Sequence, residues 1–373
     1  MTNSEAGASA GMTALRQTEP QRLELLRKIG EARGSMVLTY ITSFREGWDT
    51  MVLSEDVRIL ERHAARARAD GVKKLDIFLS TWGGDATVPW AFHSMLRDYL
   101  PKAKISVILP YEAYSAGTSI ALGGDEIIMG LSSVMGPTDT QAGGYFWQPE
   151  PTGGGVSSLK GFLDMLRDFD IKGKLDDRQT LDWLTRNANP LTLGEVYRKF
   201  KENKRKLEKI IGGRLKPLSD KDHQRILDYF LYEVGIHHQG IRRREAMEAG
   251  VSYITPLEDT PIEGSVEELF GAYAEVMQLF APFIRRQPRG GGGYGGDVDI
   301  AGEHAGDTPV VMIESLYETN AAFRAFGIDR HWAPVPDRKT PADGSVAADQ
   351  DYGAKLSMSW SSHERQGTLR RSR

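Results

Sequence analysis

Residues 111–130, YEAYSAGTSIALGGDEIIMG, carry the pattern that is most informative about the fold. They follow an apolar pattern, ISVIL at residues 105–109, which predicts a buried strand. Ser115 lies between this strand and the small residues 116–118, which fit the first turn of a tightly packed helix. A serine in that position is exposed at the positive end of a helix, where a developing oxyanion is stabilised.

A glycine turn upstream strengthens this interpretation. The pattern KLDIFLST at residues 74–81 predicts another buried strand, and it runs into WGGD at residues 82–85. Glycines after a strand let backbone N–H groups approach a substrate closely, so the N–H groups of Gly83 and Ala116 are a suitable oxyanion pair. Each turn alone also fits an ordinary strand-to-helix connection, with Ser115 as a helix cap. Two such turns in consecutive βα units favour a catalytic site.

Three motifs in order make the chain resemble a known family. They are DIFLSTWGGD at residues 76–85, YSAGTSIALGGDEIIMG at 114–130 and SSVMGPTDTQ at 132–141. They are similar to the glycine turn, the nucleophile turn and the Gly-Pro-x-Asp-x-Gln segment of the ClpP/crotonase superfamily. Within it, the chain resembles the serine dehydrogenase proteinase (SDH) family of Clp-fold serine proteases. Weaker similarity runs from about residue 35 to about residue 251.

The order of strands and helices agrees with this resemblance. Alternating βα units with nearly all-apolar strands imply a mostly parallel sheet covered by helices, with both turns on one edge. The expected fold class is α/β, with ClpP/crotonase-like repeated βα units, then a helical region and a flexible C-terminal extension. Strands are expected at residues 36–42, 75–80, 105–109 and 125–129. A helix is expected to begin at Ser54, and further helices are expected at residues 88–99, 115–122, 161–169, 179–186, 193–211 and 266–280.

Composition changes along the chain predict its domain organisation. The run RGGGGYGG marks a flexible linker, and the last forty residues are rich in Asp, Gly, Ser, Pro and Arg, as disordered tails are. The expected segments are 1–34, disordered to residue 19 and then a charged helix over 21–33; 35–285, the serine protease domain; 286–306, the linker; 307–333, a small ordered element of one strand and one helix; and 334–373, a disordered tail.

The composition also excludes several classes of function. A formal net charge of −4 gives no reason to expect a nucleic-acid partner, and the basic run at residues 198–209 is interleaved with glutamates, as solvated helix faces are. The chain has no cysteine, so it has no disulfide, thiolate zinc site or cysteine nucleophile. No phosphate-loop motif is present, and no metal, nucleotide or organic cofactor is expected. Neither a signal peptide nor a membrane span is expected, which favours a cytoplasmic location.

The general base is the least determined part of the site. A serine nucleophile needs a histidine oriented by an acid, or a lysine whose pKa is lowered by burial. No histidine lies between His93 and His223, so a ClpP-type triad is not expected. The resemblance to the Ser-Lys peptidases of the superfamily implies a lysine some tens of residues after the serine, before a helix. Lys174 is the first candidate, and Lys172 and Lys160 are the alternatives.

Two histidines and an aspartate complete the candidates. His237 or His238 is a further alternative for the base, whereas adjacent histidines without a flanking acidic pair do not predict a metal site. Asp139 is expected to orient a loop or a lysine, because an exposed aspartate is too weak a base at neutral pH. The residues expected to shape the two turns are Gly84, Gly117 and Thr118.

These features together predict a serine peptidase. It would hydrolyse protein or peptide substrates through an acyl-enzyme on Ser115, with Gly83 and Ala116 as the oxyanion hole. The resemblance implies a homo-oligomer, because superfamily members build their sites near subunit contacts. Two alternatives stay open: a crotonase-like acyl-CoA enzyme, and a catalytically silent Clp-fold scaffold that binds a partner. Trp82 stands where ClpP relatives have proline, which bears on substrate preference.

Overall fold

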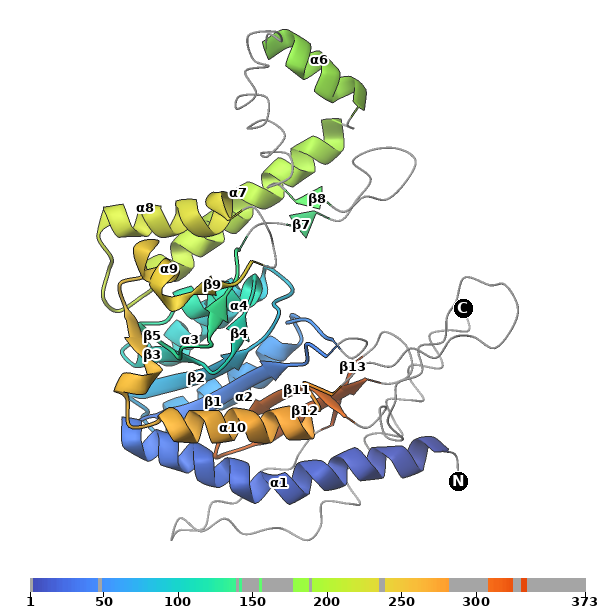
Figure 1. The fold of residues 1–373 in the computed structure, drawn as a ribbon, viewed down its shortest axis with the longest axis vertical. Helices are drawn as coiled ribbons and strands as arrows, with labels where there is room; N and C mark the ends of the chain where they lie inside the picture. The colour runs from blue at the N-terminus through green and yellow to red at the C-terminus, as the bar shows by residue number, and fades with distance from the viewer. Residues whose placement is uncertain are drawn as a thin grey trace.

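The central feature of the molecule is a mixed sheet between two layers of helices (Figure 1). The computed structural model describes residues 3–45, 49–138, 141–142, 154–155, 177–187, 190–234, 239–281, 308–324 and 330–333. The strand order in the sheet is β10-β5-β3-β2-β1-β11-β12-β13. The expected α/β fold class with a mostly parallel sheet and helices after the core is thereby confirmed.

Five strands form the parallel part of the sheet. They are β1 (Met36–Thr42), β2 (Lys74–Ser80), β3 (Lys104–Leu109), β5 (Glu126–Met129) and β10 (Ile254–Pro256). The connections contain α2 (Asp56–Ala69), α3 (Val88–Tyr99) and α4 (Ala116–Leu122). β10 is not among the expected strands, and the start of α2 also differs from expectation. Its N-terminal cap is Glu55 rather than Ser54, and the Asp56 carboxylate in its first turn accepts hydrogen bonds from the Leu53 N–H at 2.9 Å and from the Tyr40 hydroxyl at 2.5 Å.

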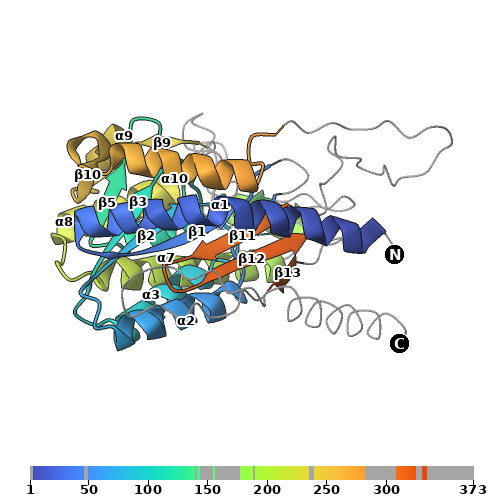
Figure 2. The same cartoon turned by 90° about the horizontal axis from the view of Figure 1, so that it is seen from below.

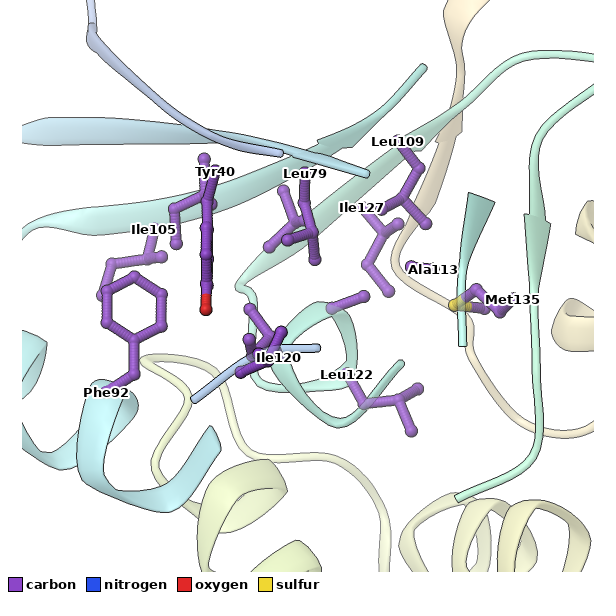
Figure 3. Close-up of a cluster of buried hydrophobic side chains, with 14 of the residues drawn as sticks. Tyr40, Leu79, Phe92, Ile105, Leu109, Ala113, Ile120, Leu122, Ile127 and Met135 are labelled. Carbon is purple, nitrogen blue, oxygen red and sulfur yellow. The ribbon is translucent and has the colours of Figure 1, made fainter. Parts of the chain in front are cut away.

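Side chains alternate along the strands between two hydrophobic cores. Figure 3 shows the first, in which Leu79, Ile105, Leu109 and Ile127 of the sheet lie near Ile120 and Leu122 of α4. On the other face, strand residues pack against α1 (Asn3–Arg33) and α10 (Glu263–Val276), which lie side by side in Figure 2. Both faces of the sheet are therefore covered, as expected for parallel strands.

Helix α1 is longer than the sequence indicates. The sequence analysis expects disorder to residue 19 and a helix over 21–33, but the structure has one helix from Asn3 through Pro20 to Arg33. A proline inside a helical pattern normally marks a boundary, because its ring clashes with the preceding turn. Tertiary packing overrides this signal, since leucines on both sides of Pro20, including Leu15 and Leu23, are buried in the second core.

The segment after the expected linker joins the main sheet. β11 (Pro309–Glu314) pairs antiparallel with β1, and β12 (Thr319–Arg324) and β13 (Arg330–Ala333) follow in order. The expectation of a strand followed by a helix is wrong for this element, because residues 319–324 form a second strand. Their conformation depends on pairing with β11 and β13, which short sequence patterns do not reveal.

The remaining elements form a helical layer and small sheets beyond α4. The helices are α6 (Asp177–Asn187), α7 (Pro190–Gly212), α8 (Asp220–Asp228) and α9 (Arg243–Glu248), with η2 (Tyr229–Glu233) and η3 (Leu257–Asp259). The short strands are β4 (Glu112–Ala113), β6 (Val134–Met135) and β9 (Ile241–Arg242) in one sheet, and β7 (Gln141–Ala142) and β8 (Gly154–Gly155) in another. The expected helix at 161–169, the glycine run and the tail lie outside the described residues.

A buried ion pair fastens α1 to β11. The Arg22 guanidinium donates to both Glu314 carboxylate oxygens, at 2.9 and 3.2 Å, and both side chains are fully buried. Glu314 also accepts hydrogen bonds from the hydroxyls of Tyr273 at 2.6 Å and Thr319. A buried carboxylate with this many donors depends on all of them, because removing one leaves charge without compensation.

We expect Arg22→Met to lower the free energy of unfolding by about 3–5 kcal/mol, because it leaves the Glu314 carboxylate buried beside an apolar group. Adding Glu314→Gln to this variant should recover at least half of the loss. Urea denaturation followed by circular dichroism measures both. Arg244→Met, which breaks an exposed pair with Glu248, is the control and should leave the free energy unchanged. A single variant as stable as wild type would contradict the role assigned to Arg22.

Candidate functional site

The glycine turn and the serine turn lie in direct contact at one edge of the sheet. A Cβ atom built on Gly83 would lie 2.8 Å from the Ser115 Cβ, 3.0 Å from the Ala116 nitrogen and 2.5 Å from the Tyr114 carbonyl oxygen. Gly83 also has a φ of 94°, in the region that favours glycine. A residue with a Cβ atom would clash at position 83. These short distances also show that the structure brings together Gly83, Ser115 and Ala116, three of the residues that the sequence singles out.

Ser115 has a strained backbone at the start of α4. Its φ is 52° and its ψ is −112°, and it is one of two non-glycine residues with positive φ among the described residues. It occupies the cap position of α4, yet its side chain makes no capping hydrogen bond, and no described residue is a hydrogen-bond partner of its half-buried hydroxyl. Strain of this kind costs of order 1–3 kcal/mol and clusters at functional sites.

The two expected oxyanion donors differ in their present partners. The Ala116 N–H, in the first turn of α4, has no acceptor among the described residues, as is usual at a helix start. The Gly83 N–H donates to the Thr81 Oγ1 at 3.1 Å. A hydrogen bond of this length can be bifurcated, so the Gly83 proton can also be shared with a second acceptor.

Gly84 and Gly117 are required by close backbone packing. At Gly84, whose φ is 151°, a Cβ would lie 2.3 Å from the Val52 carbonyl oxygen. At Gly117, a Cβ would lie 2.5 Å from the Cγ2 methyl of Thr81. The absence of a side chain at Gly84 therefore lets the loop before α2 contact the glycine turn. The absence of one at Gly117 lets α4 pack against the end of β2.

Thr118 of α4 holds the segment that includes Gly136. Its buried hydroxyl donates to the Ala113 carbonyl at 2.6 Å and accepts the Gly136 N–H at 3.0 Å. It thus joins β4 to the end of β6, in the Gly-Pro-x-Asp-x-Gln segment. Thr118 shapes the site without facing it.

The stacked aromatic rings of Trp82 and Phe44 lie beside the glycine turn and were not predicted from the sequence. Trp82, 45% exposed, directly precedes Gly83, stacks on Phe44 at a ring distance of 5.9 Å and donates its indole N–H to the Glu112 carboxylate at 2.6 Å. Burial raises the pKa of Glu112, and the indole hydrogen bond opposes this rise. On the other side of the turn Met51 is 59% exposed. The signal in the sequence was the tryptophan before the two glycines.

His93 is hydrogen-bonded to the backbone of α4. Its Nε2 is 2.8 Å from the Ile120 carbonyl oxygen of α4, which makes Nε2 the protonated nitrogen. Burial lowers the pKa of His93 to about 4, against the hydrogen bond to Ile120, which raises it. The neutral ring supports α4, and it is bonded to the helix backbone rather than to Ser115.

The described residues contain neither a metal-binding cluster nor a membrane-spanning helix. Within the described ranges, no group of at least three His, Asp or Glu residues is arranged to bind a metal ion. The described helices also include none with the length and apolar character needed to cross a membrane. The candidates outside the described residues are Lys174, Lys172, Lys160, His237, His238 and Asp139.

Comparison with known proteins finds a family model that matches the part of the chain that holds this site. Residues 10–149 match the family described as ClpP-like SDH-type serine proteinase, which confirms the resemblance stated from the motifs. Two uncharacterized proteins of Methanocaldococcus jannaschii are similar to parts of the chain. MJ1495 is 34% identical over 131 residues and MJ0137 is 32% identical over 136 residues, matching 34% and 35% of this chain. The chain spans less than half the length of these relatives, 44% and 46%.

Solved structures give only partial superpositions. Two variants of the 1510-N membrane-bound stomatin-specific protease, one of them in complex with a substrate peptide, are 15% and 16% identical to the chain, each with a TM-score of 0.35. Each covers 59% of this chain, and the matches span 79% and 74% of those chains. A 1510-N membrane protease specific for a stomatin homolog from Pyrococcus horikoshii is 23% identical, with a TM-score of 0.22, over 27% of this chain and 49% of that one. Superposition this limited transfers no residue role.

The lowered pKa of His93 predicts a pH dependence of stability. Between pH 6.5 and about 4 the unfolded chain binds a proton at this histidine and the folded chain does not, so stability falls as the pH falls through this window. His93→Gln keeps a donor for the Ile120 carbonyl and removes the titration. Between pH 7 and pH 4, His93→Gln should lose less free energy of unfolding than wild type, by roughly 2–3 kcal/mol. Urea denaturation of both proteins at the two pH values measures this difference. Equal losses in both proteins would contradict the buried neutral histidine.

The contact between Gly117 and Thr81 predicts a compensating pair. Gly117→Ala should destabilise the protein by about 1–3 kcal/mol, because the new methyl overlaps the Thr81 methyl. Thr81→Ser removes that methyl and should rescue Gly117→Ala in the double variant. The matched control is Gly271→Ala, at an open position of α10, which should stabilise by up to about 1 kcal/mol. Thermal unfolding of the four proteins tests this, and additive effects would argue against the contact.

Proposed function

We propose, because residues 10–149 belong to the family of ClpP-like SDH-type serine proteinases, that the chain is a serine peptidase that hydrolyses protein or peptide substrates through an acyl-enzyme on Ser115. The observation that carries this proposal is the contact between Gly83 and the turn of Ser115 and Ala116. Because the Gly83 backbone packs against the strained serine and the Ala116 nitrogen, the contact supports a role for the Gly83 and Ala116 N–H groups in acyl transfer on Ser115.

The reaction follows from this geometry. The Ser115 hydroxyl oxygen attacks the scissile carbonyl carbon, and the base accepts the hydroxyl proton. The carbonyl oxygen becomes an oxyanion held by the N–H groups of Ala116 and Gly83, the latter shared with Thr81. The intermediate then collapses: the carbonyl re-forms, the bond between the carbonyl carbon and the amide nitrogen breaks, and the base gives its proton to the leaving amine. A water molecule attacks the acyl-enzyme in the same way, which releases the acid product and restores the serine.

A lysine is the proposed base, with Lys174 first and Lys172 and Lys160 as alternatives. A lysine accepts a proton at neutral pH only where burial or a like charge lowers its pKa. His237 and His238 are the other candidates, since an imidazole has a suitable pKa without such a shift. Asp139 is proposed to orient the base. No described residue is a hydrogen-bond partner of the Ser115 hydroxyl, and the proposed base comes from another part of the chain or from a second copy.

The surroundings of the turn support a peptide substrate. Exposed apolar side chains flank the two glycines, Trp82 before them and Met51 opposite Gly84. An acyl-CoA enzyme uses the same oxyanion hole without a nucleophile and gives no reason for strain at Ser115. A homo-oligomer in the cytoplasm, acting without a cofactor, is the proposed working form.

Labelling with a fluorophosphonate tests the nucleophile and the base. Wild-type protein should form one adduct at Ser115, mapped by mass spectrometry, and Ser115→Ala should form none. Ser119→Ala is the matched control, because Ser119 lies one turn further along α4 and its hydroxyl donates to the Ser115 carbonyl. This control should label like wild type.

The same assay separates the base candidates. Lys174→Ala should slow labelling by at least about a hundredfold, the usual contribution of a general base. Labelling that survives this change moves the base to Lys172, Lys160, His237 or His238, each tested by its own alanine variant. The concentrations tested should include those at which the protein forms oligomers. If folded wild-type protein labels at none of them, the peptidase proposal is overturned in favour of a scaffold or an acyl-CoA enzyme.

A further inference from the structure

Both backbone groups of Gly83 are held by residues outside the glycine turn. The carbonyl of Gly83 accepts the Val52 N–H at 2.8 Å, and its N–H donates to the Thr81 hydroxyl at 3.1 Å. These two bonds fix the peptide groups on either side of Gly83. The direction of the proposed oxyanion donor is therefore set by Val52 and Thr81.

The first connection leads from Gly83 to the C-terminal hairpin through two buried threonines. Thr81 shares a hydrogen bond of 2.6 Å with Thr42, and both side chains are completely buried. Thr42 is the last residue of β1 and pairs with Val311 of β11. Since the Thr81 methyl also contacts Gly117, the same threonine touches both the glycine turn and the nucleophile helix.

The second connection runs through backbone hydrogen bonds. The Ser43 N–H donates to the Val310 carbonyl of β11 at 2.7 Å, and the Ser43 carbonyl accepts the Thr50 N–H at 2.9 Å. Two residues later, Val52 binds the Gly83 carbonyl, and its own carbonyl accepts the Asp85 N–H at 2.9 Å. The backbone groups of Ser43, Thr50 and Val52 thus link β11 to the glycine turn.

The hairpin is itself fixed at its turn end by a buried polar cluster. His63 of α2 lies between the Ser315 hydroxyl, at 2.9 Å from Nδ1, and the Asn320 amide, at 3.1 Å from Nε2. Arg62 donates to the Asn320 carbonyl oxygen at 2.5 Å. Both strands of the hairpin extend from this cluster, and in Figure 1 β11 lies between β1 and β12.

We propose that Thr42 and Thr81 are positioning residues for the Gly83 N–H, and that the β11–β12 hairpin acts on the site through them. This inference rests on the proposed function, and it gives a role to a segment that lies outside the family match at residues 10–149. A glycine turn has more conformational freedom than any other, so its geometry depends on what holds it. Oxyanion donors are effective only when they are held in place before the reaction.

The first test removes one hydroxyl. Thr42→Val keeps the shape and loses the hydrogen bond to Thr81, whereas Thr42→Ser keeps it. We expect the rate constant of fluorophosphonate labelling at Ser115 to fall about tenfold in Thr42→Val, equivalent to about 1.4 kcal/mol, and to return to within about twofold in Thr42→Ser. Thr255→Val is the control, because it loses a hydrogen bond to Glu126 at the opposite edge of the sheet and should label normally.

The second test loosens the hairpin in the full chain. Asn320→Ala removes the partner of His63 and Arg62, and hydrogen exchange should then become faster at β11, at Val52 and at Gly83, with slower labelling of Ser115. Exchange in β10 should stay as in wild type. Faster exchange confined to the hairpin, with normal labelling, would overturn the proposal, as would equal labelling of the two Thr42 variants.

These tests separate this inference from the proposed function. Circular dichroism and thermal unfolding establish that each variant is folded, and the exchange measurement in Asn320→Ala tests the coupling if Thr42→Val does not fold. Exchange at Gly83 does not depend on catalysis. A wild-type protein that never labels defeats the peptidase proposal, and unchanged exchange at Val52 and Gly83 in Asn320→Ala defeats the coupling, whichever way the labelling turns out.

Discussion

The approach of the Gly83 backbone to the Ser115 turn is the constraint on which the site depends. It requires β2 and β3 to lie side by side and parallel, so that the turns after them meet at one edge. It excludes a side chain at Gly83, and the packing of α4 against β2 excludes one at Gly117. The positive φ of Ser115 belongs to the same arrangement, since the core under α4 holds it in place.

Much of this arrangement could be predicted from the sequence, because local patterns encode it. The strands at residues 74–80 and 105–109 are runs of apolar residues, and the two turns are marked by glycines and small residues. Features that depend on distant partners could not be predicted. No sequence pattern near Thr42 indicates that its hydroxyl shares a hydrogen bond with Thr81, 39 residues later in the chain. Likewise, β12 is a strand only because β11 and β13 flank it.

Buried charges join the layers where apolar packing alone would not fix their register. Arg22 reaches Glu314 on β11, and near the other end of α1 Arg33 binds Asp76 of β2 at 2.5 Å and Glu126 of β5 at 2.9 Å. One helix is thus tied to three strands. Because an unpaired buried charge is costly, a sliding of α1 along the sheet is penalised at both ends at once.

The pairing of β1 with β11 has a consequence for how the protein is made. Thr39 and Glu314, partners across these strands, are 275 residues apart in the chain. Closing so long a loop is slow, and a growing chain leaves the edge of β1 unpaired until β11 has been synthesised. The nascent protein therefore carries the residues of its site long before their geometry is complete, and during synthesis its open strand edge needs protection from other chains.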